Sequence, residues 1–270
     1  MTNNVQSSLS YLVYTGEKPV YIASTGGADA QLSINAEFEE HLVAIHDARE
    51  LEPPATLDLQ GFALVEQHTG VVDFYAMDSI KADYEAEIRD LVLAATGGSE
   101  VLIFDHTLRS DSSSVRGERQ TREPATVIHN DYTDQSAERR LRDLLPAAEA
   151  EERLQRRFAI VNTWRSVGEP VIRSPLACCD AATIEAGDLV ASERRAAERI
   201  GELELIRWNP DHRWYYYPEM NRDEVLLIKT FDSARDGRAR RSIHSAFENP
   251  LAADNAPPRE SIESRCLVFF

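Results

Sequence analysis

Short apolar segments rich in β-branched and aromatic residues recur along the chain and predict strands. In the first hundred residues they occur at 10–14, 21–23, 42–45 and 61–65. Between residues 79 and 95 the apolar positions follow helical spacing, so we expect one helix there, ended by Gly97 and Gly98. A strand is expected to resume at 101–104.

The second half of the chain predicts more strands. Residues 107–123 are polar and rich in serine and arginine, which is typical of a surface loop. Residues 136–157 are expected to be helical, with Pro146 as a break or as the first turn of a new helix. Strands are expected at 158–161, 215–217, 225–228 and 266–270. This pattern predicts an α+β fold in which an antiparallel sheet system is interrupted by helices.

Composition and charge narrow the function classes. Hydrophobic residues make up 43% of the 270 residues and charged residues 28%, which is ordinary for a globular protein. The formal net charge is −17, and so acidic a chain repels nucleic-acid phosphates and anionic lipids. We therefore expect neither nucleic-acid nor membrane partners. No apolar run approaches the ~20 residues that cross a bilayer, and the N-terminus lacks a signal-peptide pattern, so we expect a cytoplasmic protein.

The three cysteines are not arranged as metal ligands. Cys178 and Cys179 are adjacent, a spacing that seldom forms a disulfide, and Cys266 lies in an apolar run. No Cys-x-x-Cys motif is present in the sequence. A metal site would therefore use histidine and carboxylate ligands.

One histidine lies in His129-Asn130-Asp131, directly after the apolar residues 126–128. On an extended chain the side chains of His129 and Asp131 project to the same side, where they could bind one metal ion. On the tripeptide alone, a surface ion pair is the simpler interpretation. A third ligand decides between these interpretations.

We expect the third ligand from a strand remote in sequence, and His244 is the candidate. Two histidines and one carboxylate on one face of octahedral Fe(II) leave positions open for other ligands. Arg259 and Ser261 follow His244 in the chain, and an arginine near such a site can bind the far carboxylate of 2-oxoglutarate. The order His-x-Asp, His, Arg-x-Ser is more specific than any of its parts.

Longer motifs run through residues 10 to 270, in the order Asp47-Ala-Arg49, Gly61-Phe62, Phe104-Asp-His-Thr107 with Arg109, His129-Asn-Asp-Tyr-Thr133, Asn162-Thr-Trp-Arg165, Pro175-Leu-Ala-Cys-Cys-Asp180, His212-Arg-Trp-Tyr-Tyr-Tyr-Pro218, Asp223-Glu-Val-Leu-Leu-Ile-Lys229, Asp232-Ser233 and Pro257-Pro-Arg-Glu-Ser-Ile262. This series resembles the hydroxylase/desaturase family of Fe(II)/2-oxoglutarate-dependent oxygenases, which includes a fungal gibberellin desaturase and a component of cephamycin methoxylation. One departure is Ser166, where the family often has proline.

The resemblance implies a double-stranded β-helix (jelly-roll) core with flanking helices. It also implies a single oxygenase domain over residues 1–270, with the strand and helix elements of about the first hundred residues packed on that core. Fe(II), 2-oxoglutarate and O2 are the implied cofactor and co-substrates. The matching motif positions imply His129, Asp131 and His244 as catalytic metal ligands, and Arg259, Ser261 and Asn162 as residues that bind 2-oxoglutarate.

We therefore expect an oxygenase that hydroxylates or desaturates a small natural product in secondary metabolism, and that could form a homodimer or heterodimer. One alternative is a non-catalytic partner subunit of a related oxygenase complex. Such a subunit need not keep His129, Asp131, His244 and Arg259. Another alternative is a cupin-like metal enzyme without 2-oxoglutarate, which would leave Arg259 without a role.

Overall fold

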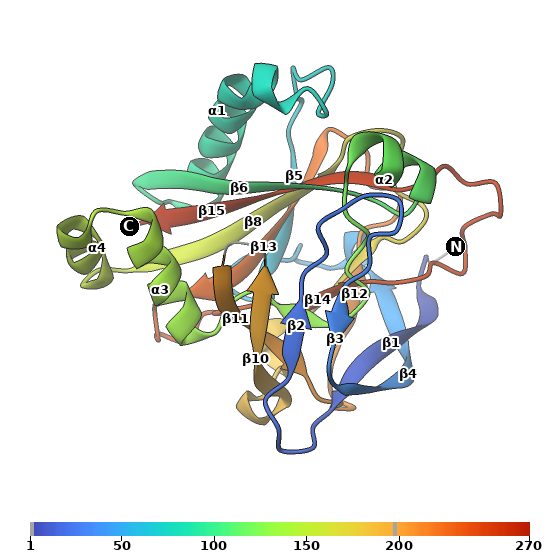
Figure 1. Cartoon of the computed structure of the whole chain (residues 1–270), viewed down its shortest axis with the longest axis horizontal. Coiled ribbons are helices and arrows are strands. Elements are labelled where there is room, and N and C mark those ends of the chain that lie inside the picture. Colours follow the sequence, from blue (N-terminus) through green and yellow to red (C-terminus); the bar gives the residue numbers. More distant parts are fainter. Residues whose placement is uncertain (1–2, 197–198) are drawn as a thin grey trace.

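Two β-sheets dominate the computed structural model, which describes residues 3–196 and 199–270 (Figure 1). From edge to edge, the ten-stranded sheet contains β1 (Val5–Val13), β4 (Glu37–Asp47), β12 (Trp214–Tyr216), β9 (Leu176–Cys179), β14 (His244–Ala246), β7 (His129–Asn130), β11 (Arg199–Ile206), β10 (Leu189–Ala196), β2 (Val20–Ile22) and β3 (Ser33–Ile34). The five-stranded sheet contains β5 (Phe62–Glu66), β13 (Glu224–Asp232), β8 (Phe158–Ser166), β15 (Glu260–Phe269) and β6 (Glu100–Ser110). Most pairs are antiparallel, whereas β2/β10 and β4/β12 are parallel.

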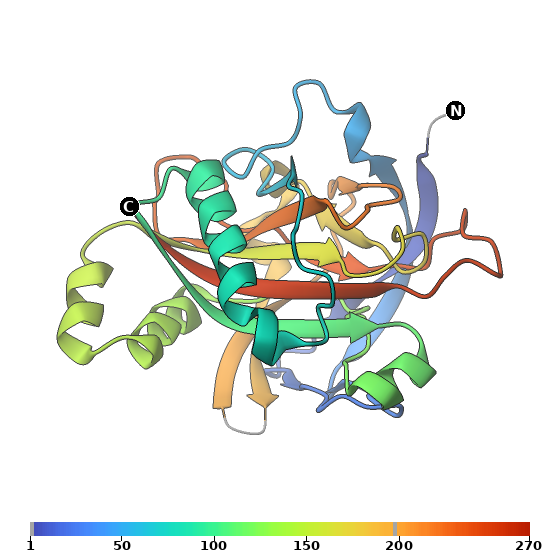
Figure 2. The same cartoon turned by 90° about the horizontal axis from the view of Figure 1, so that it is seen from above.

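Four α-helices accompany the sheets: α1 (Met77–Thr96), α2 (Ser113–Arg119), α3 (Asp134–Leu144) and α4 (Ala147–Leu154). Short 3₁₀ turns lie at Ala48–Glu50, Ala181–Thr183 and Ala186–Asp188. Figure 2 shows α1 lying across one face of the five-stranded sheet. Its apolar face packs there, through Tyr84, Ile88, Leu91 and Val92, against residues such as Val161, Leu227 and Val268. This face of the sheet is therefore closed, and the opposite face is left for the site.

The two sheets share an apolar core on their facing sides. Phe62 and Trp164 of the five-stranded sheet pack in one cluster with Leu176, Cys178 and Ala246 of the ten-stranded sheet. Because side chains alternate along a strand, the polar residues next to this cluster on the same face also lie between the sheets. The candidate metal ligands are among them.

The expected helices are confirmed, and Gly97 ends α1 with a φ of 69° while its amide donates to the Leu93 carbonyl. Pro146 directly precedes α4, as expected of a fresh helical turn. The prediction of a surface loop at 107–123 is wrong in part. There β6 continues to Ser110, because it pairs along its whole length with β15, and Ser112 caps α2 by accepting from the Val115 amide.

The first hundred residues supply strands to both sheets, since β1 to β4 lie in the larger sheet and β5 in the smaller. The α+β architecture with mostly antiparallel pairing is confirmed. The organisation as a single domain stays a prediction.

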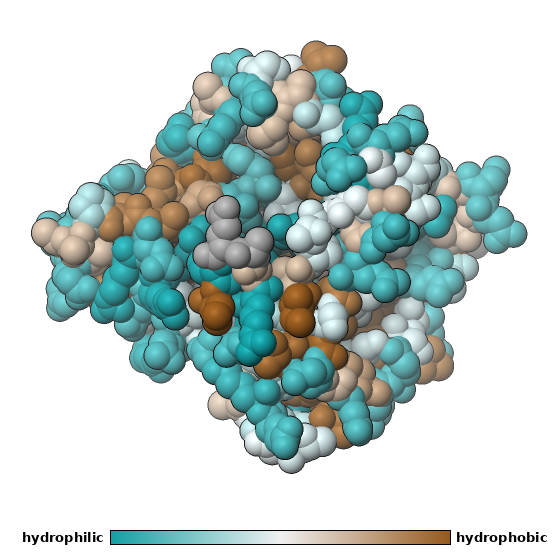
Figure 3. Space-filling view, viewed as in Figure 1, coloured by the Kyte–Doolittle hydropathy of each residue, from teal (hydrophilic) through white to brown (hydrophobic). Residues whose placement is uncertain are grey.

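Hydrophilic residues cover most of the face drawn in Figure 3, and apolar residues form small separate patches. Exposed apolar side chains such as Leu42, Val72 and Leu251 come from distant parts of the chain. Within the described residues, no helix has the length and apolarity needed to cross a membrane. The expected cytoplasmic location and dimer stay predictions.

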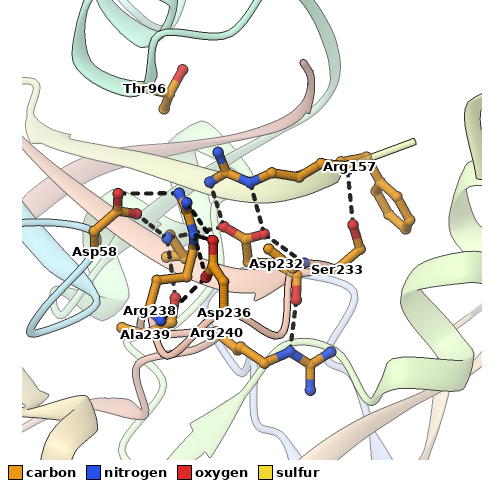
Figure 4. Close-up of polar contacts among 12 residues, drawn as sticks. Asp58, Thr96, Arg157, Asp232, Ser233, Asp236, Arg238, Ala239 and Arg240 are labelled. Carbon is orange, nitrogen blue, oxygen red and sulfur yellow. Dashed lines mark hydrogen bonds and ion pairs between the residues drawn. The ribbon is translucent and has the colours of Figure 1, made fainter.

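A buried ion network holds the segment that leads into β14 (Figure 4). Lys229 of β13 is 1% exposed, and its ammonium donates to Asp58 Oδ1 (2.7 Å), Asp232 Oδ2 (3.0 Å) and the Ala239 carbonyl (3.0 Å). Arg157 binds both oxygens of Asp232, at 3.1 and 2.7 Å. The network therefore fixes the path of the chain a few residues before His244.

The substitution Lys229→Met should lower the free energy of unfolding by about 3 kcal/mol, because it removes a buried cation from Asp232 and the donor to the Ala239 carbonyl. Urea unfolding measures the loss. Lys81→Met on the exposed side of α1 is the control, and it should change stability by less than about 0.5 kcal/mol. A Lys229→Met protein as stable as the control would contradict a structural role for the network.

Candidate metal centre

His129, Asp131 and His244 meet where β7 and β14 lie side by side. The two strands pair antiparallel with His129 directly opposite His244, and the imidazole centroids are 4.6 Å apart. Asp131 follows β7 immediately, before α3 begins. One potential ligand atom from each residue lies within 4.8 Å of the other two. The fold thus gathers two imidazoles and a carboxylate from distant positions in the sequence.

Both imidazoles are oriented by the backbone. His129 Nδ1 lies 2.8 Å from the Val127 carbonyl oxygen, and His244 Nδ1 lies 3.3 Å from that of Ser242. An N–H donated from Nδ1 leaves the lone pair on Nε2 in each ring. Burial and the neighbouring His244 lower the pKa of His129 to about 4, so its ring is neutral at pH 7. Neutral imidazole is the form that binds metal ions.

The carboxylate of Asp131 is held from the five-stranded sheet. Its Oδ2 accepts hydrogen bonds from Asn162 Nδ2 (2.7 Å) and Arg265 Nε (3.1 Å), and its Oδ1 lies 3.7 Å from His129 Nε2. Burial opposes ionisation, but the charge of Arg265 and the Asn162 hydrogen bond hold the pKa of Asp131 well below its ordinary value. Oδ1 of an ionised carboxylate is therefore turned toward the imidazoles.

Glu263 and Arg265, which are alternate residues of β15, face the region around Asp131. Glu263 accepts from Asn162 Nδ2 (2.9 Å) and from Arg265 Nη2 (2.8 Å), and Arg265 Nη1 also binds Asp105 at 2.6 Å. Arg265 therefore joins three carboxylates, those of Asp105, Asp131 and Glu263. Residues that hold a metal ligand in this way orient it and tune its affinity for the ion.

Arg259 is the one buried arginine of this face whose guanidinium has no carboxylate within 4.0 Å among the described residues. It is 2% exposed, donates to the Ser174 carbonyl (2.7 Å) and to Ser261 Oγ (3.2 Å), and lies over the Trp164 ring at 5.0 Å. Burial and the charge of Arg109 lower its pKa to about 9. A buried cation without a counter-charge is costly, so the surroundings of Arg259 favour an incoming anion.

The structure brings His129, Asp131 and His244 together, and it places Arg259 beside Ser261. The expected contact of Asn162 with 2-oxoglutarate stays a prediction, since both bonds of its Nδ2 go to Asp131 and Glu263. Its Oδ1 is buried without a hydrogen-bond partner in the described part of the chain.

The sequence interpretation missed Glu263 and Arg265. The apolar residues 266–270 predict only the second half of β15. The available signal was the two-residue spacing that continues from Arg259 and Ser261 to Glu263 and Arg265, because alternate residues of a strand share one face.

Comparisons with known proteins agree with this architecture. A family model described as an oxidoreductase/YMDC permease-like domain matches residues 9–269. Hydroxylase/desaturase efuI of Hormonema carpetanum is 35% identical over 260 residues, covering 88% of this chain and 86% of the relative. The Fe(II)/2-oxoglutarate-dependent dioxygenase nvfI of Aspergillus novofumigatus is 33% identical over 251 residues, covering 88% of this chain and 87% of the relative. A solved structure of the iron and alpha-ketoglutarate-dependent endoperoxidase NvfI aligns with a TM-score of 0.85 and 29% identity, over 99% of this chain and 98% of the other.

The two facing sheets and the His-Asp-His cluster are features of a non-haem metal enzyme. The extent of the family match makes the assignment more specific. The chain belongs to the hydroxylase/desaturase family of Fe(II)/2-oxoglutarate-dependent dioxygenases, which confirms the resemblance drawn from its motifs.

His129→Ala and His244→Ala should each weaken Fe(II) binding by more than about 100-fold, because each removes one imidazole from the cluster. Anaerobic Fe(II) titration in the presence of 2-oxoglutarate, followed through the weak visible charge-transfer band, measures the loss. His46→Ala, an exposed histidine on β4, is the matched control and should titrate like the unaltered protein. Persistence of the band in both site variants would contradict the assignment of the ligands.

The lowered pKa of His129 also makes the metal-free protein sensitive to acid. An unfolded histidine has a pKa near 6.5, so between about pH 6.5 and 4 the unfolded chain binds a proton that the folded chain does not. Stability is therefore full above this window and falls as the pH drops. From pH 7 to 5 the free energy of unfolding of the metal-free protein should fall by about 2 kcal/mol more than that of His129→Gln. Urea unfolding at the two pH values measures both changes. Equal losses of unfolding free energy in the two proteins would contradict the claim that His129 makes the protein sensitive to acid.

Proposed function

We propose that this chain is an Fe(II)/2-oxoglutarate-dependent dioxygenase that hydroxylates or desaturates a small natural product in secondary metabolism, and that its two sheets form a double-stranded β-helix. One observation carries the proposal. Two oriented imidazoles and an ionised carboxylate converge on one point, on the face that also presents a buried arginine without a carboxylate partner in the described structure. The hydroxylase/desaturase relatives support the reaction type.

His129 Nε2, Asp131 Oδ1 and His244 Nε2 would hold the iron. The donor set fits Fe(II), since it offers two imidazole nitrogen atoms and one carboxylate oxygen close together. The buried cysteines do not belong to the cluster, and Cys178 and Cys179 have pKa values raised by burial. Bound there, Fe(II) would supply the activation of O2 that is coupled to the oxidative decarboxylation of 2-oxoglutarate.

The remaining site residues bind and orient. Arg259 binds the carboxylate of 2-oxoglutarate that is remote from the metal, with the hydroxyl of Ser261 beside it. The Ser174 carbonyl and the Trp164 ring keep the guanidinium in place before the co-substrate arrives. Asn162 and Arg265 hold Asp131 so that its Oδ1 stays turned toward the imidazoles.

The same residues weigh against the alternatives. A non-catalytic partner subunit has no need of an oriented triad, and a cupin-like enzyme without 2-oxoglutarate leaves the buried Arg259 without a counter-charge. Iron-loaded protein that releases no succinate from 2-oxoglutarate, with or without candidate substrates, would favour the partner subunit.

Arg259→Gln should raise the dissociation constant of 2-oxoglutarate by about 30-fold or more and leave Fe(II) affinity within about twofold, because it removes one partner of a buried charge pair. Anaerobic titration of the Fe(II)-loaded protein with 2-oxoglutarate measures the change.

Arg265→Gln is the informative comparison, since it releases Asp131 and should weaken Fe(II) binding more than 2-oxoglutarate binding. Unchanged 2-oxoglutarate affinity in Arg259→Gln would contradict the role proposed for Arg259.

A further inference from the structure

Three arginines near the metal centre have no acidic partner in the described structure. Arg109 lies on β6, Arg122 precedes β7, and Arg194 lies on β10. All three are half-buried, yet none has a carboxylate oxygen within 4.0 Å among the described residues. Arg109 donates to the backbone carbonyl of Glu123 (2.8 Å) instead. These three residues are called the arginine cluster below.

Strand register places the arginine cluster on the faces that carry the site. Arg109 pairs directly with Ser261, so the two side chains lie on the same face of the five-stranded sheet. Ser261 is the residue whose hydroxyl accepts a hydrogen bond from Arg259. In the ten-stranded sheet, Val190 pairs with Leu205, and Leu205 pairs with His129. The side chains of these three residues therefore lie on one face of that sheet. Arg194 is four residues beyond Val190 on the same strand.

The even spacing between Val190 and Arg194 puts Arg194 on the face of His129, while Arg195 is exposed on the other. Arg122 and Arg109 form a backbone bridge, which ties the third arginine to β6. In Figure 1, β10 and β2 run next to each other below β6.

The arginines also act on one another and on the phenol of Tyr21. Burial and the charges of Arg109 and Arg194 lower the pKa of Arg122. Tyr21, which pairs with Arg194, is buried, and both Arg109 and Arg194 counteract the rise of its pKa. Repulsion among half-buried cations destabilises the fold, so the arrangement is one that an anion would relieve.

The nearby carboxylates of Asp105 and Glu123 lie more than 4.0 Å from these guanidinium groups. Asp105 binds Arg265 at 2.6 Å, and Glu123 accepts a hydrogen bond from Ser24 at 2.6 Å. The iron and 2-oxoglutarate roles proposed above already use Asp131, Arg259 and Arg265. The arginine cluster is therefore left with unused donors.

We propose that Arg109, Arg122 and Arg194, with the hydroxyl of Tyr21, form a cationic subsite that binds an anionic group of the organic substrate, such as a carboxylate. This inference rests on the proposed function and deepens it, because it assigns the substrate class: an acid whose anionic end binds to the arginines while another part reaches the metal. The guanidinium groups offer paired N–H donors that match the geometry of such an anion.

The test compares two dyes with the same aromatic rings, the anionic 1-anilinonaphthalene-8-sulfonate and the uncharged N-phenyl-1-naphthylamine. Each is titrated by fluorescence into anaerobic protein loaded with Fe(II) and 2-oxoglutarate. The double variant R109Q/R194Q should lose affinity for the sulfonate by about tenfold or more and keep its affinity for the uncharged dye within about twofold. R195Q, the neighbour with an exposed side chain, is the matched control and should change neither.

Two outcomes would overturn the inference. One is sulfonate affinity that is unchanged in R109Q/R194Q or that falls equally with that of the uncharged dye. The other is a loss of 2-oxoglutarate affinity in place of sulfonate affinity, which would assign the arginines to the co-substrate. Failure of the proposed function would be recognised separately, because the unaltered protein would then lack the Fe(II)/2-oxoglutarate charge-transfer band.

Discussion

The antiparallel pairing of β7 with β14 sets the position of the candidate metal centre, because it puts His129 directly opposite His244. The two strands are only two and three residues long, so they depend on their neighbours β11 and β9 for their place in the sheet. The chain leading into β14 is held in addition by the ions around Lys229. Correct geometry at the ligands therefore depends on the whole ten-stranded sheet.

The third ligand depends on the other sheet. Asp131 is held by Asn162 of β8 and Arg265 of β15, so the two facing sheets together fix the orientation of the carboxylate. Burying these charges costs stability, and it orients the Asp131 carboxylate toward the imidazoles. The chain as a whole is strongly acidic, yet this region gathers the arginines at 109, 122, 194, 259 and 265. Net charge describes the solvent-facing surface and says little about such a site.

Local sequence patterns predicted elements such as α1, whose apolar positions follow helical spacing, and the motif order predicted the family. The pattern did not predict β10, because charged residues such as Glu193, Arg194 and Arg195 interrupt it and the strand is defined by pairing with β11. Resemblance identified His129, Asp131 and His244, whose convergence depends on strand register. Glu263 and Arg265 were missed because their importance lies in contacts across the sheets, which no local pattern encodes.

The central claim is that two imidazoles and one carboxylate of this chain bind a single ferrous ion. Iron K-edge X-ray absorption spectroscopy of the anaerobic Fe(II)-loaded protein tests it most directly. The account predicts a first shell of nitrogen and oxygen atoms only, with outer-shell scattering from two imidazoles. Sulfur in the first shell, or scattering from one imidazole or none, would contradict it.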